Sequence, residues 1–565
     1  MSRSVRATLA SVALIAASAL LGGAFGKSAQ AAADAKELHL KRYSEILAAI
    51  ESSYVEELDP AKPVAASIRE MLRTLDPHSN FFEVKEFSTL QEKQKGSYFG
   101  LGITIASIEG RITVVSPFEG SPAHRLGIRA GDIIVGIEAD DARGMDIDAV
   151  VKRLRGPKGS QVRIRLDRAG YAQPLDFTVV RDEIPLHSVP YSFMVSKDVG
   201  YIRLVDFNET TACRPSEPQG CERELEKALR TLKEQGATSY VLDIRDNPGG
   251  LLDMAFAVSN LFLRKGQMVV YTKGRYKRDE SSYVTESDSP WSQVPLVVMT
   301  SRHSASASEI VAGAIQDHDR GLIVGERTFG KGLVQTIWPL RSVQGYALSL
   351  TTARYYTPSG RSIQREYGGN TALEDYQAPK ERSGCDVEGT DPRLTDAGRR
   401  VFGGDGIAPD TCIEPPKTGT VVANLQSRQA FVIFARHFES AEVAEKTAVE
   451  GAGSRARVGN DKVRLIGKDF KVSPEVVAEF ADFLKAEKIT FDPRELEANR
   501  AEIEGEILEE TMRQVFGEGA ARRRLYALDP QLKKAIESIP ASRLLLKDPQ
   551  RYISETATKR AAASR

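Results

Sequence analysis

The chain has 565 residues, which is long enough to form more than one folded domain. Hydrophobic residues make up 41% and charged residues 27% of it. Lys and Arg together number 77, as do Asp and Glu. This zero balance argues against a dedicated nucleic-acid-binding protein, which would carry a basic excess.

The first 33 residues are typical of a secretory signal peptide. Arg3 and Arg6 precede an apolar run over residues 9–24, and the Ala-Gln-Ala sequence at 29–31 supplies a small-x-small cleavage site. The run is short for a membrane span, but an uncleaved membrane anchor stays open as the alternative. We therefore expect an exported, periplasmic protein.

The next two segments differ in their periodicity. Residues 34–95 are predicted to be a helical segment, because apolar residues recur at helical spacing between Leu40 and Ile50 and again around Val64–Leu75. Residues 96–182 change to short alternating strands with Gly-rich turns, which predicts a small β domain with a helix at 147–154.

Residues 183–365 alternate buried apolar strands with helices, which predicts an α/β layer. Residues 366–418 are rich in Gly, Pro, Asp and Thr and are predicted to be a linker. Helices are expected across residues 419–546, and residues 547–565 are predicted to be a polar, frayed tail. The predicted fold class is therefore multidomain α/β (α+β).

The four cysteines lie in two irregular stretches. Cys213 and Cys221 are close in sequence, and Cys385 and Cys412 bracket a second stretch. In an oxidising compartment we expect two short-range disulfides, with unpaired surface thiols as the alternative. The C-x-x-C spacing of a zinc site is absent, and no metal or organic cofactor is expected.

A serine at 306 is the first candidate catalytic residue. It follows a buried strand and precedes a predicted helix, where the positive end of the helix dipole favours a developing oxyanion and the Ala307 N–H faces the same place. Taken alone, the Ser-Ala-Ser-Ala-Ser sequence also fits simple packing of small residues.

Lys331, between two glycines, is the candidate base. A lysine buried there would lose hydration and become a neutral proton acceptor, although a solvated turn lysine is the alternative. Gln335 lies four residues further on, where it could hold the amine. After the strand at 240–246, Gly249 or Gly250 would offer a second backbone N–H to an oxyanion hole, unless this is an ordinary strand-to-helix turn.

These segments resemble the motifs of the carboxy-terminal processing proteases, also called tail-specific proteases. The resemblance covers about residues 38–365. It implies that the middle serine of S-A-S-A-S-E, Ser306, is the nucleophile, that the lysine of F-G-K-G, Lys331, is the base, and that Gln335 supports it. His303 is close to Ser306 in sequence, but the motif favours the lysine.

Residues 96–182 resemble the PDZ domain of that family. The resemblance implies that a loop binds a peptide's terminal carboxylate through its N–H groups while the following strand pairs with the peptide. This loop consists of Tyr98, Phe99, Gly100, Leu101, Gly102 and Ile103. A β domain that serves only for packing is the alternative.

The sequence thus predicts a serine endopeptidase that acts on proteins or peptides with apolar C-termini and binds no nucleic acid. A catalytically inert PDZ adaptor and a hydrolase of small esters or amides are the competing hypotheses. A regulatory partner protein and self-association stay open, and the sequence gives no role to the C-terminal extension.

Overall fold

The computed structural model describes residues 36–108, 110–168, 171–218, 220–366, 385, 391–441 and 464–563. The predicted signal peptide lies outside the described residues. Within the described ranges, no helix has the length and apolar character needed to cross a bilayer. The chain divides into two compact units, residues 1–81 and residues 82–565.

The first unit contains two helices. One extends over residues 36–53, and α2 covers Ala61–Arg73. The Tyr43 and Ser67 hydroxyls, one from each helix, share a hydrogen bond of 2.7 Å. A short strand, β1 (Asn80–Phe82), follows. The helices predicted from the apolar spacing are therefore formed.

In the second unit, α3 (Val84–Lys95) precedes a β domain with its own apolar core. Its strands lie in the order β3-β4-β5-β7-β8, and all neighbouring pairs are antiparallel. Because β3 is the end of this order, one edge of its backbone has no neighbouring strand in the described sheet. The elements are β3 (Ile103–Ile108), β4 (Arg111–Pro117), α4 (Pro122–Arg125), β5 (Ile133–Ile137), β6 (Asp140–Asp141), α5 (Ile147–Leu154), β7 (Gln161–Asp167) and β8 (Leu175–Val180).

A six-stranded sheet forms the centre of the α/β layer that follows the β domain, in the order β10-β11-β12-β15-β16-β21. Only the β10–β11 pair is antiparallel, and the buried strands β12, β15 and β16 are the continuous apolar runs expected of parallel strands. The strands are β10 (Tyr191–Met194), β11 (Val199–Arg203), β12 (Ser239–Asp243), β15 (Leu296–Thr300), β16 (Leu322–Gly325) and β21 (Thr411–Cys412).

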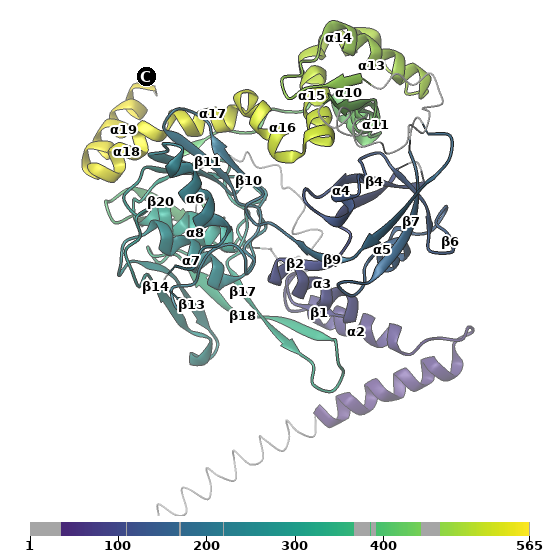
Figure 1. Cartoon of the computed structure of the whole chain (residues 1–565). Helices are drawn as coiled ribbons and strands as arrows, with labels where there is room; N and C mark the ends of the chain where they lie inside the picture. The colour runs from purple at the N-terminus through teal and green to yellow at the C-terminus, as the bar shows by residue number, and fades with distance from the viewer. Residues whose placement is uncertain are drawn as a thin grey trace, which may run out of the picture. The chain divides into compact units, whose positions relative to one another are not determined.

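Helices cover both faces of this sheet (Figure 1). One face packs against α6 (Glu224–Glu234), α7 (Leu252–Phe262) and α8 (Ala307–Asp317). The other face packs against α17 (Pro530–Glu537) and α18 (Ile539–Lys547) from the far end of the chain. The C-terminal helices therefore complete the core of the α/β layer.

A second sheet carries two hairpins in the order β17-β18-β13-β14. All three of these pairings are antiparallel. The strands are β13 (Met268–Gly274), β14 (Ser281–Val284), β17 (Leu333–Pro339) and β18 (Ala347–Tyr356).

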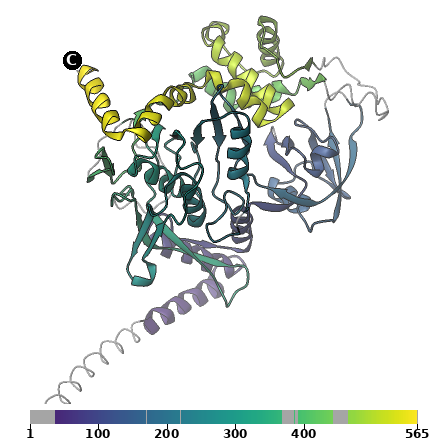
Figure 2. The same ribbon diagram turned by 60° about the vertical axis from the view of Figure 1, so that its left-hand side comes forward.

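The helices that follow the α/β layer gather in a group of their own (Figure 2), and a separate apolar core joins them. It consists of α10 (Thr420–Ser427), α11 (Ala430–Ala435), α13 (Pro474–Ala486), α14 (Pro493–Ala498) and α15 (Arg500–Phe516), with a short parallel pair of β22 (Phe438–Ser440) and β23 (Arg464–Ile466). The chain then continues through α16 (Glu518–Leu525) to α17–α19.

Two sequence predictions need correction. The described part of the predicted linker, residues 391–418, contains β19 (Asp391–Leu394), β20 (Arg400–Gly403) and β21, and Arg399 within it pairs with the buried Asp319 and with Asp410. Polar composition suggested a linker because it does not reveal such long-range ion pairs. The predicted frayed tail instead contains α19 (Pro549–Ala563).

Candidate active site

Ser306 is the N-cap of α8, directly after the turn that follows β15. Its φ of 56° and ψ of −112° lie outside the regions that non-glycine residues ordinarily adopt. Such a conformation needs support from its surroundings and is common at functional sites. The residue is half-buried, so its side chain can meet a ligand.

The two neighbouring serines are fully buried and fill structural roles. The Ser304 hydroxyl donates to the Ile244 carbonyl at 2.8 Å, and the Ser308 hydroxyl donates to the Asn247 carbonyl at 2.9 Å. Both serines connect the α8 turn to the loop after β12. Ser306 is therefore the member of the triplet that the structure leaves accessible.

A buried carboxylate, Glu309, connects the serine to the lysine loop. Its side chain is 0% exposed, and one oxygen accepts the N–H groups of Ser306 and Lys331, each at 2.8 Å. The other oxygen accepts the Thr328 hydroxyl at 2.6 Å and the Gly330 N–H at 2.7 Å. Burial raises the pKa of Glu309, although these four hydrogen bonds oppose the shift.

Glu309 is not among the site residues predicted from the sequence. The signal was nevertheless present, because Ser306-Ala-Ser-Glu309 has the S-x-x-E spacing of a helix capping box. In this structure, the Glu309 side chain accepts the N-cap N–H of Ser306, as that motif requires.

Lys331 is half-buried, which lies between the buried lysine and the solvated turn lysine that the sequence left open, and its backbone is fixed by two hydrogen bonds. Its N–H donates to Glu309, and its carbonyl accepts the Tyr355 hydroxyl. Gln335 lies on β17, where its Nε2 donates to Thr351 Oγ1 on β18 at 3.3 Å. This is not the lysine contact that the sequence predicts, and a register shift between Val334 and Gln335 lies at this point.

The glycine pair after β12 lies directly against the serine turn. A Cβ added to Gly249 would lie 2.9 Å from both the Ala307 nitrogen and the Ser306 Cβ, so this approach requires glycine. The Gly249 N–H donates to Asn247 Oδ1 at 2.9 Å. Of the two glycines that the sequence offered as oxyanion donors, Gly250 is therefore the one whose N–H is not used by Asn247.

A buried ion pair lies at the end of β12, directly before this loop. Asp243 is 0% exposed and accepts hydrogen bonds from Arg203, Arg245 and the Tyr201 hydroxyl. Burial alone would raise its pKa, but the charges of Arg245 and Arg203 outweigh burial and hold the Asp243 pKa well below its usual value. Arg245 also contacts Asp529 at the start of α17 at 2.8 Å.

The predicted carboxylate-binding loop is divided between two elements. Tyr98, Phe99 and Gly100 lie on β2 (Ser97–Gly100), which pairs with β9 (Asp182–Pro185). Leu101 and Gly102 then lead into β3, which begins at Ile103. Gly102 has a φ of +76°, and a Cβ there would lie 2.3 Å from the Ser121 Cβ. The strand that is expected to pair with a peptide, β3, is an edge strand of its sheet.

The cysteines form two disulfides, Cys213–Cys221 and Cys385–Cys412. The second disulfide connects Cys385 to β21 at the edge of the central sheet.

His303, the other residue considered near the serine, is exposed. Its backbone N–H donates to Ser301 Oγ.

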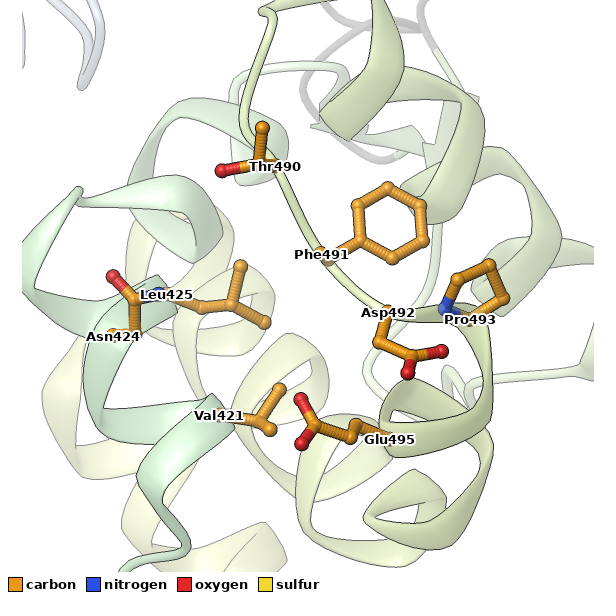
Figure 3. A pocket seen from close by; sticks show the side chains of 8 residues that line it. All are labelled: Val421, Asn424, Leu425, Thr490, Phe491, Asp492, Pro493 and Glu495. Atoms are coloured by element: carbon orange, nitrogen blue, oxygen red, sulfur yellow. The ribbon is translucent and has the colours of Figure 1, made fainter.

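One cavity, of about 550 Å³, lies far along the chain from these residues, in the C-terminal helical core (Figure 3). Val421 and Leu425 of α10 face Phe491 across it, with the Asp492 and Glu495 carboxylates at its side. None of the candidate catalytic residues lines this cavity.

Comparisons with known proteins identify the family of the chain. Residues 198–371 match peptidase family S41, and residues 113–168 match the PDZ domain family. The carboxy-terminal-processing protease of Bartonella bacilliformis is 39% identical over 348 residues, which cover 62% of this chain and 78% of the relative. That of Synechocystis is 36% identical over 305 residues, covering 53% and 68%.

A solved structure, the photosystem II D1 C-terminal processing protease, is 27% identical, with a TM-score of 0.34. The similarity covers 66% of this chain and 92% of that one.

The α/β core, with a serine at a helix N-cap, is thus that of a serine peptidase. The chain belongs to the carboxy-terminal-processing proteases of peptidase family S41 and carries their PDZ domain. The relatives therefore favour the enzyme over the inert adaptor.

Proposed function

We propose that this protein is an exported endopeptidase that cleaves substrates at a Ser306–Lys331 site. The observation that carries the proposal is that the three serines of the motif have different surroundings. The Ser304 and Ser308 hydroxyls are committed to buried carbonyls, while Ser306 is half-buried and strained, with its N–H on the same Glu309 oxygen as the N–H of Lys331.

In the proposed mechanism, the neutral Lys331 amine takes the proton of the Ser306 hydroxyl as its oxygen attacks the peptide carbonyl. The Ala307 and Gly250 N–H groups stabilise the tetrahedral oxyanion, at the N-terminus of α8. The lysine ammonium then returns the proton to the leaving amine. Water hydrolyses the acyl-enzyme in the second half, again with Lys331 as the proton carrier. Gln335 would orient the amine once its side chain leaves Thr351.

We propose that the PDZ domain selects substrates by their C-terminal tails. The terminal carboxylate would bind the loop of residues 98–103, and the peptide would add a strand to the edge of β3. An apolar final side chain is the expected preference. Two disulfides and the predicted signal peptide support an oxidising, periplasmic location, with an uncleaved anchor as the alternative.

The proposal is tested with purified protein lacking residues 1–33 and an unfolded protein substrate that ends in apolar residues. We expect cleavage by the wild type and a loss of at least about 10³-fold in Ser306→Ala. Lys331→Arg should be equally inactive, because arginine keeps the charge but does not lose its proton. A substrate with a charged tail should be cleaved more slowly.

Wild-type activity that survives in Ser306→Ala would overturn the nucleophile assignment. If the wild type binds the apolar tail but cleaves nothing, the adaptor hypothesis replaces the peptidase for this chain.

A further inference from the structure

A cavity of about 700 Å³ lies where the β13–β14 hairpin meets the β17–β18 hairpin, which are side by side in one sheet (Figure 1). Its lining is mainly basic, aromatic and hydroxylated. It consists of Arg275, Tyr276, Arg278, Asp279, Trp338, Leu350, Thr351 and Thr352.

One wall of this cavity is in contact with Gln335, the proposed supporting residue of the base. Thr351 is the register partner of Gln335 and accepts the Gln335 Nε2–H at 3.3 Å. Trp338 lies three residues beyond Gln335 on the same strand. A substrate chain that reaches the proposed base along β17 would therefore meet the cavity within a few residues.

The basic loop at the rim is folded tightly onto the sheet. The Thr272 hydroxyl donates to the Asp279 carbonyl and accepts the Ser281 N–H, each at 2.9 Å. A Cβ added to Gly274 would lie 2.5 Å from the Asp279 Cβ and 2.7 Å from the Thr352 carbonyl oxygen. These contacts hold the loop at the cavity.

The charges at the rim favour an anion. The guanidinium groups of Arg275 and Arg278 lie 5.5 and 4.8 Å from the centre of the Tyr276 ring. Asp279 offsets one of them, with its carboxylate 3.8 Å from Arg278. In the described part of the chain, no acidic group lies within ion-pair distance of Arg275. Guanidinium groups bind carboxylates through paired hydrogen bonds.

The aromatic residues supply an apolar surface beside these charges. Trp338 is 41% exposed and Tyr276 is 50% exposed. Large aromatic side chains that remain exposed next to arginines are typical of recognition surfaces. The cavity volume is within the range of sites that hold a ligand of a few side chains.

We propose that this cavity is a substrate subsite that binds a glutamate or aspartate side chain together with an adjacent large apolar one, near the scissile bond. This inference rests on the proposed peptidase function. The enzyme would then select its substrates at two places. The PDZ domain would bind the C-terminal tail, and the cavity would bind residues close to the scissile bond.

The test uses Ser306→Ala protein, so that binding is measured without cleavage. Two unstructured peptides are compared that differ only at one position, Glu-Phe in one and Gln-Phe in the other. Trp338 is an internal probe, since the only other tryptophan, Trp291, is 8% exposed and lies in the core. We expect the Glu peptide to bind roughly tenfold more tightly and to change the exposed tryptophan's fluorescence.

In the Ser306→Ala background, the further double substitution Arg275→Gln/Arg278→Gln should remove this preference. The matched control, Arg264→Gln/Lys265→Gln, removes two positive charges outside the cavity and should keep it. Equal affinity for the two peptides, or an unchanged preference in Arg275→Gln/Arg278→Gln, would overturn the subsite.

Cleavage by the wild type separates this inference from the proposed function. Cleavage of both peptides with equal kcat/KM would overturn the subsite and leave the peptidase intact. Discrimination in binding without any cleavage would support the acidic-peptide site and overturn the peptidase activity.

Discussion

Glu309 illustrates how a residue outside the reacting set can govern the site. Its two oxygens accept four hydrogen bonds. The donors are the Ser306 N–H, the Thr328 hydroxyl and the N–H groups of Gly330 and Lys331. A carboxylate, which only accepts hydrogen bonds, satisfies all four. The amide of glutamine would place an NH2 group against two of these donors.

We therefore expect Glu309→Gln to be a severe substitution despite its similar shape. It should lower kcat/KM by at least about tenfold and destabilise the fold by roughly 1–3 kcal/mol, because buried donors lose their acceptor. Enzyme assays together with urea unfolding check both effects. A Glu309→Gln enzyme of normal activity and stability would show that the carboxylate does not position the serine and lysine segments.

Asp243 predicts how stability depends on pH. Its pKa in the folded protein is held below the ordinary aspartate value of 3.8, so it stabilises the fold above that value and the contribution is lost as the pH falls. Asp243→Asn leaves buried arginine charges without this partner and should cost roughly 3–5 kcal/mol at pH 7. The difference from wild type should narrow in urea titrations below pH 3.8. A difference that is constant with pH would contradict this assignment.

At the scale of elements, α17 is the connection between the C-terminal extension and the candidate site. The Asp529 carboxylate caps α17 by accepting the Gln531 and Leu532 N–H groups and also pairs with Arg245. Gln531 Oε1 accepts a second hydrogen bond from Arg245 at 2.8 Å. Because Arg245 is two residues before Asn247, the extension supports the loop that carries the proposed oxyanion donor.

Asp529→Ala should remove both the cap and the ion pair, at a cost of about 2 kcal/mol in unfolding free energy. Asp529→Asn keeps a capping oxygen and should cost about half as much. Unfolding curves for the two variants separate the contributions. Equal losses would mean that the cap contributes nothing, and an Asp529→Asn protein as stable as the wild type would mean that the ion pair with Arg245 contributes nothing.

The strands were easier to predict than the contacts between them. Alternation identifies β7, where Val162, Ile164 and Leu166 are buried between exposed polar residues, and apolar runs identify β12 and β15. The edge strand β21 was missed, because two residues in a polar stretch carry no periodicity. Its place is fixed instead by pairing with β16.

At the scale of the whole molecule, the two disulfides are cross-links that persist in an oxidising compartment, such as the proposed periplasm. The Cys213–Cys221 pair closes a loop of 8 residues and the Cys385–Cys412 pair a loop of 27. Replacing each pair with serines should cost about 2.5 and 3.5 kcal/mol respectively, from the loop entropy regained by the unfolded chain. Thermal unfolding with and without reductant measures both losses. An unchanged Tm in reductant would contradict a structural role for the bonds.

The sequence predicted which residues to examine better than it predicted how they are joined. Ser306, Lys331 and the glycine pair were proposed as site residues from short motifs, because their chemistry depends on residue type and local turn. Glu309, Arg245 and Asp529 were missed as site residues because their importance arises from contacts between segments, in the last case 284 residues apart. Such pairings leave no local pattern in the chain.

The position of α17 and α18 on the central sheet has a consequence for the order of synthesis. One apolar face of that sheet is covered only when α17 and α18 have been made. Since chains emerge from the N-terminus onward, this core remains incomplete long after the strands of the sheet have been synthesised. A polypeptide that terminates before α17 would therefore lack half of the packing that supports the candidate catalytic site.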